Sequence, residues 1–192
     1  MIDGRLGSSS TALSRCQVYW PTCFTQNNAW GLCRDLAIES ACFDQTLVWR
    51  NGLAYRLGGR TTTGSTVPVT TYGTYSADGF TWTSQTAPFT TLQKCMQGAC
   101  TFGDEIFEFG GYNSSGVATS GAIAWNPSLA VTRAPPVIPN ATRMVGGSET
   151  SSAARPVGVC AVPCGPFIYL IGGAASGNSS GDGSCCIFRY VP

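Results

Sequence analysis

The sequence predicts an all-β protein in which one small antiparallel sheet recurs along the chain. Three glycine doublets that each close a run of strand-forming residues carry this prediction: Gly58-Gly59, Gly110-Gly111 and Gly172-Gly173. A turn signal precedes each doublet, and an aromatic residue follows it on a later strand-forming run. The doublets are spaced about 50 to 60 residues apart, a period typical of repeat architectures.

The composition is that of a folded, weakly charged protein. The 192 residues suffice for a domain with a core, and a hydrophobic content of 43% argues against disorder. Only 11% of the residues are charged, against roughly 25% in an average soluble protein. The net charge is +1, without a basic run. We therefore expect no binding to nucleic acid or to an anionic membrane surface.

Cysteine is abundant, with 10 residues, whereas histidine is absent. No CxxC pair occurs, and the spacings do not make a zinc-ribbon pattern, so we expect disulfides in an oxidising compartment. The expected disulfide cysteines are Cys16, Cys23, Cys33, Cys42, Cys95, Cys100, Cys160, Cys164, Cys185 and Cys186. Cys95 with Cys100, and Cys160 with Cys164, are candidates for local bridges or for bridges to adjacent strands. The adjacent Cys185 and Cys186 should bond different partners, because neighbouring strand residues point to opposite faces.

Three N-glycosylation sequons begin at Asn113, Asn140 and Asn178, all in expected loops. Together with the cysteines, they predict an extracellular or cell-surface glycoprotein. No stretch reaches the ~20 apolar residues of a membrane span. The first residues lack the apolar core of a signal peptide. We therefore expect either a mature form or natural ends that lie outside this chain.

Two parts are expected along the chain. Residues 1–42 form an N-terminal arm and a cysteine-rich segment, with a strand at CQVYWP and a short helix in WGLCRDLAIES. Residues 43–192 hold three units, and the third is incomplete. The expected bounds of the units are about 43–92, 93–150 and 151–192.

Each unit should begin with a hairpin. In the first unit, Asn51-Gly52 joins LVWR to LAYRL and suits a type I′ turn; strands in VPVTTYGTYS and FTWTSQ follow. The second unit has Gly103-Asp104 at its turn, then EIFEF, GAIAW and the proline-rich LAVTRAPPVIP, which should lie at a sheet edge. The third unit has a turn at Pro163–Pro166, then FIYLI and CCIFRY, without a fourth strand.

This order of strand, turn, apolar strand, glycine doublet, loop and aromatic strand resembles the kelch repeat. In that family, a tyrosine on the third strand is followed after six residues by a tryptophan, and Tyr75 and Trp82 match this spacing. The second unit departs from it, with Trp125 in the tyrosine place and Thr132 in the tryptophan place. The third unit offers Tyr190 and then ends. The stretch RPVGVCAVPCGPFIYLIGG is similar to the start of a kelch blade.

The resemblance covers residues 43–192 and implies four-stranded blades in a β-propeller of about four to eight blades. The chain would supply fewer than three complete blades, so its end sheets would expose apolar faces. Copies could close a ring or stack into a filament, or the chain could belong to a longer propeller. The N-terminal strand could complete the third blade in the same chain or in a neighbouring copy, and we expect the second arrangement.

Catalytic chemistry is restricted because histidine is missing. Ser-His-Asp and Cys-His catalysis are excluded, as is the histidine-ligated copper site of the kelch-type copper radical oxidases. Asp104, Glu105 and Glu108 cluster at the second hairpin, but Glu105 and Glu108 should face opposite sides of a strand. We interpret these acidic residues as a solvated turn plus a rim or interface residue, and Asp182 as part of a flexible loop. We expect no catalytic residue, metal or cofactor.

Aromatic residues are the remaining binding candidates. Tyr19, Trp20 and Trp30 lie outside the repeat and could form a docking surface or stack on sugar rings. Three tryptophans at regular blade positions should instead be core: Trp49, Trp82 and Trp125.

The sequence thus predicts a non-enzymatic extracellular structural protein that self-associates through blade faces or strand completion, for instance as a subunit of a surface filament or appendage. Copies of the chain are the expected partners, and glycans are a further candidate. Two alternatives stay open: an extracellular carbohydrate- or protein-binding propeller module, and a fragment of a larger secreted enzyme.

Overall fold

The computed structural model describes eleven ranges of the chain: residues 2–5, 12–19, 30–35, 44–60, 73–77, 82–84, 94–119, 121–129, 131–133, 157–173 and 187–192. Every regular element within these ranges is a β-strand, which confirms the predicted all-β class. The same ranges contain no helix long and apolar enough to cross a membrane.

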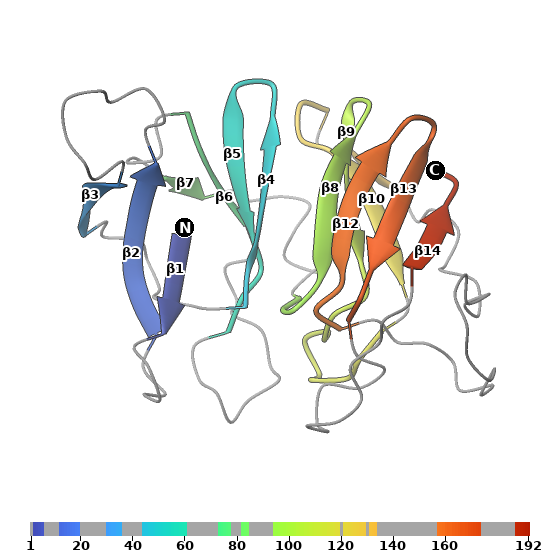
Figure 1. Ribbon diagram of the computed structural model, residues 1–192, viewed down its shortest axis with the longest axis horizontal. Helices are drawn as coiled ribbons and strands as arrows, with labels where there is room; N and C mark the ends of the chain where they lie inside the picture. The colour runs from blue at the N-terminus through green and yellow to red at the C-terminus, as the bar shows by residue number, and fades with distance from the viewer. Residues whose placement is uncertain are drawn as a thin grey trace.

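The strands form four antiparallel sheets, which Figure 1 shows side by side in chain order. The N-terminal sheet, ordered β1-β2-β3, consists of β1 (Ile2–Arg5), β2 (Ala12–Tyr19) and β3 (Trp30–Asp35). Sheet I, ordered β4-β5-β6-β7, consists of β4 (Thr46–Arg50), β5 (Leu53–Leu57), β6 (Gly73–Ser76) and β7 (Thr83–Ser84). Sheet II, ordered β8-β9-β10-β11, consists of β8 (Gly98–Phe102), β9 (Glu105–Phe109), β10 (Ala122–Asn126) and β11 (Val131–Arg133). Sheet III, ordered β12-β13-β14, consists of β12 (Cys160–Cys164), β13 (Phe167–Ile171) and β14 (Ile187–Tyr190).

The same hairpin opens sheets I, II and III. In each, two five-residue strands pair along their whole length across a two-residue turn, and the three turns point to the same end of the molecule (Figure 1). Asn51 and Gly52 have φ angles of 49° and 78°, as a type I′ turn requires. Gly103 and Gly165 have φ angles of 58° and 57° at the first turn position, where a type II′ turn needs glycine. The three predicted hairpins are therefore confirmed.

The outer strands also follow the predicted plan. Strands β6, β10 and β14 lie within the three runs expected to form third strands, and β7 and β11 supply the fourth strands of sheets I and II. Strand β11 lies at a sheet edge, as its proline-rich sequence predicts. In the part of the chain that the structure describes, sheet III ends at β14.

The N-terminal part differs from the expectation at three points. Residues 30–35 form strand β3 rather than a helix, because Tyr19 pairs with Trp30 and strand pairing overrides a weak helical preference. Residues 2–5, expected in an irregular arm, form strand β1. Strand β2 pairs with β1 and β3, so it does not complete sheet III within the chain. Completion in a neighbouring copy stays a prediction.

Strand β6 is offset from its counterparts by one residue. Trp125 and Tyr190 occupy the same place on their sheets, each opposite an isoleucine of the preceding strand. In sheet I this place belongs to Ser76, opposite Ala54, and not to Tyr75. The expected equivalence of Tyr75 with Trp125 and Tyr190 is therefore wrong, because a shift of one residue moves a side chain to the other face.

Three lead-in residues join the sheets through their backbones: Asp44, Met96 and Gly158. Each lies two positions before the first strand of its sheet and has a positive φ, of 58°, 56° and 69° respectively. The Met96 N–H donates to the Asp44 carbonyl at 2.9 Å, and the Gly158 N–H donates to the Met96 carbonyl at 2.7 Å. These bonds hold β8 next to β4 and to β12, and we call these three edge strands the inner strands.

The glycine doublets make room for the lead-in segments. A Cβ at Gly58 would lie 2.1 Å from the Lys94 carbonyl oxygen, far inside van der Waals contact. The Gly59 N–H donates to the same oxygen at 3.1 Å. At Gly111, a Cβ would approach the Cys95 carbonyl to 2.6 Å. Glycine is required here because the backbone of the next segment passes directly over these positions.

Apolar side chains fill the spaces between sheets I, II and III. The cluster between sheets I and II contains Val48, Tyr55, Leu57, Ile106 and Trp125. The cluster between sheets II and III is larger and contains Cys100, Phe107, Phe109, Ala122, Ala124, Val159, Ile168, Leu170 and Tyr190. A smaller cluster of Cys95, Tyr112 and Val157 lies at the lead-in segments. The core thus lies between sheets, as expected for stacked units that cannot bury their faces alone.

Candidate interaction surface

Each sheet has two faces, which point in opposite directions along the row of sheets. We call the face toward the next sheet in chain order the forward face, and the opposite one the rear face. The forward face of sheet I carries Val48, Tyr55 and Leu57, which pack against Ile106 and Trp125 on the rear face of sheet II. The forward face of sheet II packs in the same way against the rear face of sheet III. One packing rule therefore operates twice in the chain.

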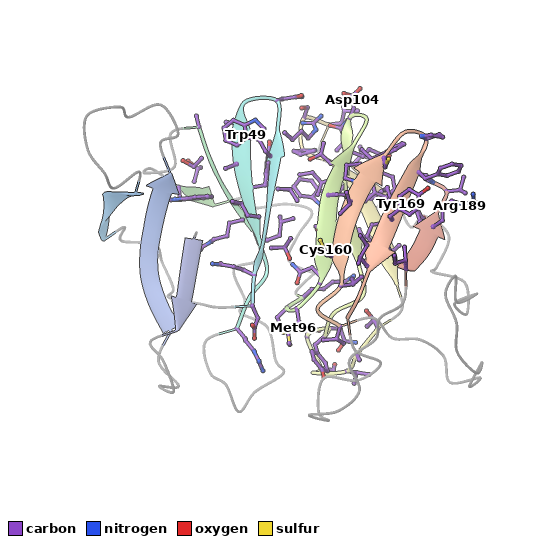
Figure 2. The ribbon with its side chains drawn as sticks, viewed as in Figure 1. Trp49, Met96, Asp104, Cys160, Tyr169 and Arg189 are labelled. Carbon is purple, nitrogen blue, oxygen red and sulfur yellow. The ribbon has the colours of Figure 1, made fainter. Side chains whose placement is uncertain are left out.

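The forward face of sheet III meets no further sheet among the described residues. It is formed by alternate residues of β12 and β13, and Figure 2 shows Tyr169 on the side of the array away from sheet II. Its side chains are sulfur-containing, aliphatic or aromatic: Cys160, Val162, Cys164, Phe167, Tyr169 and Ile171.

Equivalent positions in the three sheets differ sharply in exposure. The residue before the glycine doublet is 1% exposed at Leu57 and 0% exposed at Phe109, but 41% exposed at Ile171. The middle of the inner strand is buried at Val48 and Cys100, whereas Val162 is 39% exposed. The first two glycine doublets are buried, and the third is only half-buried. Sheet III therefore exposes the kind of surface that the same chain buries twice elsewhere.

On the forward face of sheet III, two aromatic rings and the Arg189 guanidinium contact one another. The Arg189 guanidinium carbon lies 4.8 Å from the centroid of the Phe167 ring. The Phe167 and Tyr169 rings meet edge to face, with centroids 6.4 Å apart. Figure 2 shows Arg189 and Tyr169 close together at the C-terminal end of the array. Rigid aromatic groups and arginine are typical of the energetic centres of protein interfaces.

The buried interface between sheets I and II also has a polar link at Arg50. This side chain is buried, and its Nε donates to the Asp104 carbonyl at 3.1 Å. Its two Nη atoms lie 3.3 Å from Ser128 Oγ and 3.5 Å from Asn126 Oδ1. Arg50 thus connects the first hairpin to the β8–β9 turn and to the β10–β11 turn of sheet II.

Four cysteines have side chains that the structure describes, and all four are thiols. A local Cys160–Cys164 bridge is wrong, because these residues occupy the two ends of an extended strand, roughly 13 Å apart. A disulfide requires Cα atoms within about 7 Å. A Cys95–Cys100 bridge is not formed either, and burial raises the pKa of Cys95 to about 11 and that of Cys100 to about 12. These two thiols are inert core groups.

The acidic residues of the second hairpin are separated by strand geometry. Asp104 is exposed at the turn, Glu105 is half-buried on the forward face, and Glu108 is fully buried on the rear face. The opposite orientation of Glu105 and Glu108 is as predicted, so they do not form a glycosidase pair. The turn residue Asp104 is exposed as expected, and Glu108 lies buried at the interface between sheets I and II, which agrees with the interface alternative.

Glu108 accepts a hydrogen bond from Trp125 inside the cluster between sheets I and II. The Trp125 Nε1–H donates to Glu108 Oε1 at 2.8 Å. Burial raises the pKa of Glu108 to about 8, although the hydrogen bond from Trp125 acts in the opposite direction. At neutral pH this carboxyl group is therefore mostly protonated and uncharged.

A second buried titratable group lies at the joint between sheets I and II. Lys94, the only lysine of the chain, is 5% exposed, and its Nζ has no hydrogen-bonding partner among the described residues. Burial lowers the pKa of Lys94 to about 8. Nearby, Gln97 Nε2 donates to the Leu57 carbonyl at 3.0 Å, while Gln97 Oε1 is buried without a partner in the described ranges. Such groups cost stability unless they are satisfied.

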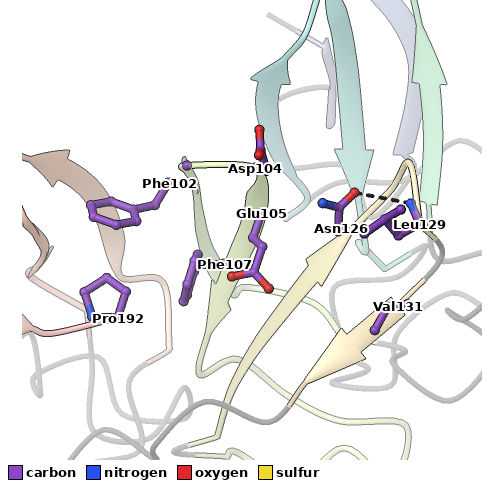
Figure 3. Close-up of a pocket in the computed structure, with 9 residues that line it drawn as sticks. Phe102, Asp104, Glu105, Phe107, Asn126, Leu129, Val131 and Pro192 are labelled. Carbon is purple, nitrogen blue, oxygen red and sulfur yellow. Dashed lines mark hydrogen bonds between the residues drawn. The ribbon is translucent and has the colours of Figure 1, made fainter.

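A hollow of about 560 Å³ opens beside the turn of the second hairpin (Figure 3). Phe102 and Phe107 form its apolar wall, and Asp104 and Glu105 supply carboxylates. Gly103 of the hairpin turn also lines the hollow, and the other lining residues come from the end of β10, the β10–β11 turn, β11 and the C-terminus: Asn126, Leu129, Val131 and Pro192. Apolar walls with a few polar groups are typical of small-ligand sites.

The aromatic residues expected to be core separate into three cases. Trp125 is 1% exposed, which confirms the expectation. Trp82 is half-buried, and the Arg56 guanidinium carbon lies 5.9 Å from its ring centroid. Trp49 is 62% exposed, so the core assignment is wrong for this residue. Its place on the inner strand puts it on the rear face of sheet I, which the described residues leave uncovered at this point.

Of the three N-terminal binding candidates, two are described by the structure. Tyr19 and Trp30 pair directly opposite each other on β2 and β3. The following predicted residues lie outside the described ranges: Trp20, Cys23, Cys42, Asn140, Asn178, Asp182, Cys185 and Cys186.

Asn113 lies in a compact turn, as its sequon predicts. Its Oδ1 accepts hydrogen bonds from the N–H groups of Ser115 and Val117, both at 3.0 Å. The side-chain oxygen thus orders the loop.

Three features of the interfaces were not expected from the sequence: the Arg50 link, the buried Lys94 and the lead-in hydrogen bonds. Arg50 has a detectable signal, because it is the last residue before the Asn-Gly turn and shares the forward side of its strand with Val48. The lead-in residues Asp44, Met96 and Gly158 differ in type, so only their fixed distance from the strands marks them.

In comparisons with known proteins, no family model matches the chain, and no curated protein has a significantly similar sequence.

Proposed function

We propose that this chain is a non-enzymatic extracellular structural protein that associates with copies of itself by stacking kelch-like blades, as a subunit of a ring or a surface filament. Sheets I, II and III are the blades in this proposal, and β4, β8 and β12 are their inner strands. The equal hairpin registers and the repeated lead-in hydrogen bonds support a common unit. The cysteine content and the sequons support an extracellular location.

The observation that carries the proposal is the exposed forward face of sheet III. Ile171 is 41% exposed where Leu57 and Phe109 are buried by the next sheet. At about 25 cal/mol for each Å² of apolar surface removed from water, covering this face with another sheet would be strongly favourable. A structural role is further supported by the chemistry of the chain, which has no histidine and whose Glu105 and Glu108 carboxyl groups face opposite sides.

The proposal is tested by measuring the mass of the purified chain as a function of concentration, with sedimentation velocity and negative-stain electron microscopy. We expect concentration-dependent oligomers that the Ile171→Lys substitution weakens about tenfold or more, since a charge would have to be buried. Val117→Lys is the matched control, because Val117 is 48% exposed but lies in the loop between β9 and β10, not on the forward face of sheet III. A compact monomer at all concentrations would contradict the proposal.

The hollow beside the second hairpin supports a second candidate, a carbohydrate-binding propeller module. Aromatic walls and carboxylates are groups that bind sugars, and Tyr19 and Trp30 are opposite each other in the register of β2 and β3. A glycan-array signal that Phe102→Ala or Trp30→Ala abolishes, in a chain that stays monomeric, would favour this function over self-association.

A further inference from the structure

We propose that two copies of the chain join through the forward faces of their sheets III, and that disulfides between Cys160 of one copy and Cys164 of the other link them covalently. This mode of pairing rests on the proposed self-association and supplies the bond that makes it permanent. The occupant of the exposed forward face is therefore the same face of a second copy.

The opposite end of the row of sheets is covered. On the rear face of sheet I, Ala54, Arg56 and Ser76 are buried, although Leu47 and Trp49 at the inner strand are exposed. Figure 1 places the N-terminal sheet on that side of sheet I. The forward faces of two sheets III are both open, and identical surfaces pack around a two-fold axis. The N-terminal sheets then lie at the two outer ends of the pair, where any longer assembly continues.

The first position of each inner strand contacts the sheet that follows. In sheet I, the Thr46 hydroxyl donates to the Gln97 carbonyl at 2.6 Å. In sheet II, Gly98 holds this position, and a Cβ there would lie 2.5 Å from the Val159 carbonyl oxygen. In sheet III, the position belongs to Cys160, an exposed thiol on β12 (Figure 2). This thiol is therefore placed to reach whatever covers the forward face.

The last position of each inner strand has the same role. In sheet I, Arg50 donates to the Asp104 carbonyl of the next sheet at 3.1 Å. In sheet II, Phe102 packs against the apolar cluster between sheets II and III. In sheet III, this position belongs to Cys164, a second exposed thiol. Both ends of β12 thus present a thiol where the other inner strands contact their neighbour.

The spacing of these thiols identifies the partner. Cys160 and Cys164 lie on one face of β12, roughly 13 Å apart, with Val162 midway between them. A two-fold axis over Val162, perpendicular to the strands, lays β12 of one copy antiparallel over β12 of the other and exchanges the strand ends. Each Cys160 then faces Cys164 of the other copy. A partner must offer two thiols at this same spacing, and a second copy does so.

The rest of the forward face fits the same operation. In β13, Ile171 lies opposite Cys160 and Phe167 lies opposite Cys164, so the axis brings Ile171 of one copy over Phe167 of the other. Apolar side chains thus cover apolar side chains on both strands. Arg189, on the outer strand β14, is exposed and lies over the Phe167 ring of its own chain, at the rim of this contact.

Bond formation requires an oxidant, and glutathione disulfide supplies the oxidising equivalents. The thiols of Cys160 and Cys164 lose two protons and two electrons as one S–S bond forms, and one glutathione disulfide is reduced to two glutathione thiols. A pair of copies with both bonds consumes two molecules of glutathione disulfide. An oxidising compartment, as the cysteine content predicts, keeps such bonds formed.

A complementation experiment with two single variants tests the pairing. In a glutathione redox buffer, the unaltered chain should give a covalent dimer on a non-reducing gel, with a Cys160–Cys164 cross-link mapped by mass spectrometry. Cys160→Ser and Cys164→Ser should each lose this dimer, because every bond needs one thiol of each kind. An equimolar mixture of the two variants should regain a dimer. The oxidised dimer should also survive a dilution of about a hundredfold that dissociates the reduced chain.

Two controls separate this bond from random cross-linking. The double variant Cys160→Ser/Cys164→Ser gives the background from the remaining cysteines. In that double variant, Val117→Cys adds an exposed thiol in the loop between β9 and β10, and it should add no dimer. Circular dichroism checks the fold of each variant.

Two results would overturn the pairing. One is a Cys164→Ser chain that still dimerises through Cys160, which indicates parallel inner strands. The other is a mapped bond from Cys160 or Cys164 to another cysteine of the same chain, in a covalent monomer. With either result, the proposed function stands if the reduced chain still assembles and Ile171→Lys weakens that assembly. If the reduced chain is monomeric at all concentrations, the proposed function fails as well.

Discussion

At the scale of single residues, the Glu108 carboxyl group is the clearest source of pH dependence. Its pKa is raised from an ordinary 4.5 to about 8 in the folded chain, so the folded state holds a proton that the unfolded state has released. The contribution of Glu108 to the free energy of unfolding should therefore be greatest below about pH 4.5 and should fall as the pH rises toward 8. Each pKa unit corresponds to about 1.4 kcal/mol, so the loss amounts to a few kcal/mol.

Glu108→Gln tests this linkage. Glutamine keeps an oxygen for the Trp125 Nε1–H but cannot ionise. We expect the variant to be about as stable as the unaltered chain at pH 5 and more stable by a few kcal/mol at pH 9. Urea unfolding at several pH values measures this difference, with Glu105→Gln on the same strand as the control. An unchanged pH profile would show that Glu108 is not desolvated.

The effect of Gly58→Ala on stability is a second prediction at the scale of single residues. Its φ is 67°, and an added Cβ would meet the Lys94 carbonyl at 2.1 Å, so Gly58→Ala must displace the lead-in segment. We expect Gly58→Ala to destabilise the chain by about 3 kcal/mol or more. Gly52→Ala is the matched control, because Gly52 also has a positive φ of 78° but has open space around it. It should cost only about 1 kcal/mol by thermal denaturation, and equal losses would contradict the role given to Gly58.

At the scale of elements, Arg50 links the first hairpin to sheet II. Arg50→Met retains most of the apolar stem but removes the donors to the Asp104 carbonyl, Ser128 and Asn126. We expect a loss of about 2 to 3 kcal/mol and faster hydrogen exchange at the Gly103-Asp104 turn. Hydrogen–deuterium exchange with mass spectrometry measures the local effect. Protection that is unchanged at this turn would show that apolar packing alone joins the two sheets.

The hairpins were predictable because their signals are local. Asn51-Gly52, Gly103 and Gly165 encode turns that fix the register of the strands beside them. The loops between second and third strands carry no such signal, which explains the one-residue error at Tyr75. The helix expected in WGLCRDLAIES is wrong for residues 30–35 for a related reason, because the decisive pairing of these residues with β2 is non-local.

The interaction surface was only partly predictable. Open apolar ends follow from the number of repeats, and the sequence indicated them. Which residues lie on the open faces depends on the direction of stacking, since only the contacts between sheets separate forward from rear. For this reason Trp49 was expected in the core, although it is 62% exposed.

At the scale of the whole molecule, the low charge content predicts how the assembly responds to salt. Only 11% of residues are charged, and the exposed forward face of sheet III is apolar apart from Arg189, which pairs with Tyr169. We expect the association constant to change less than about threefold between roughly 50 and 500 mM NaCl, because screening acts on charges. Ammonium sulfate should strengthen association by favouring apolar burial. Sedimentation velocity measures both effects, and dissociation at high NaCl would indicate an electrostatic contact.

The joint at Asp44, Met96 and Gly158 uses only peptide N–H and carbonyl groups, so its hydrogen bonds need no particular side chain. An aspartate, a methionine and a glycine all make the joint, although its left-handed backbone favours glycine. Successive units can therefore differ in sequence and still be joined by the same backbone hydrogen bonds. A gene encoding such a chain could lengthen, shorten or shuffle its modules without redesigning the connection between them.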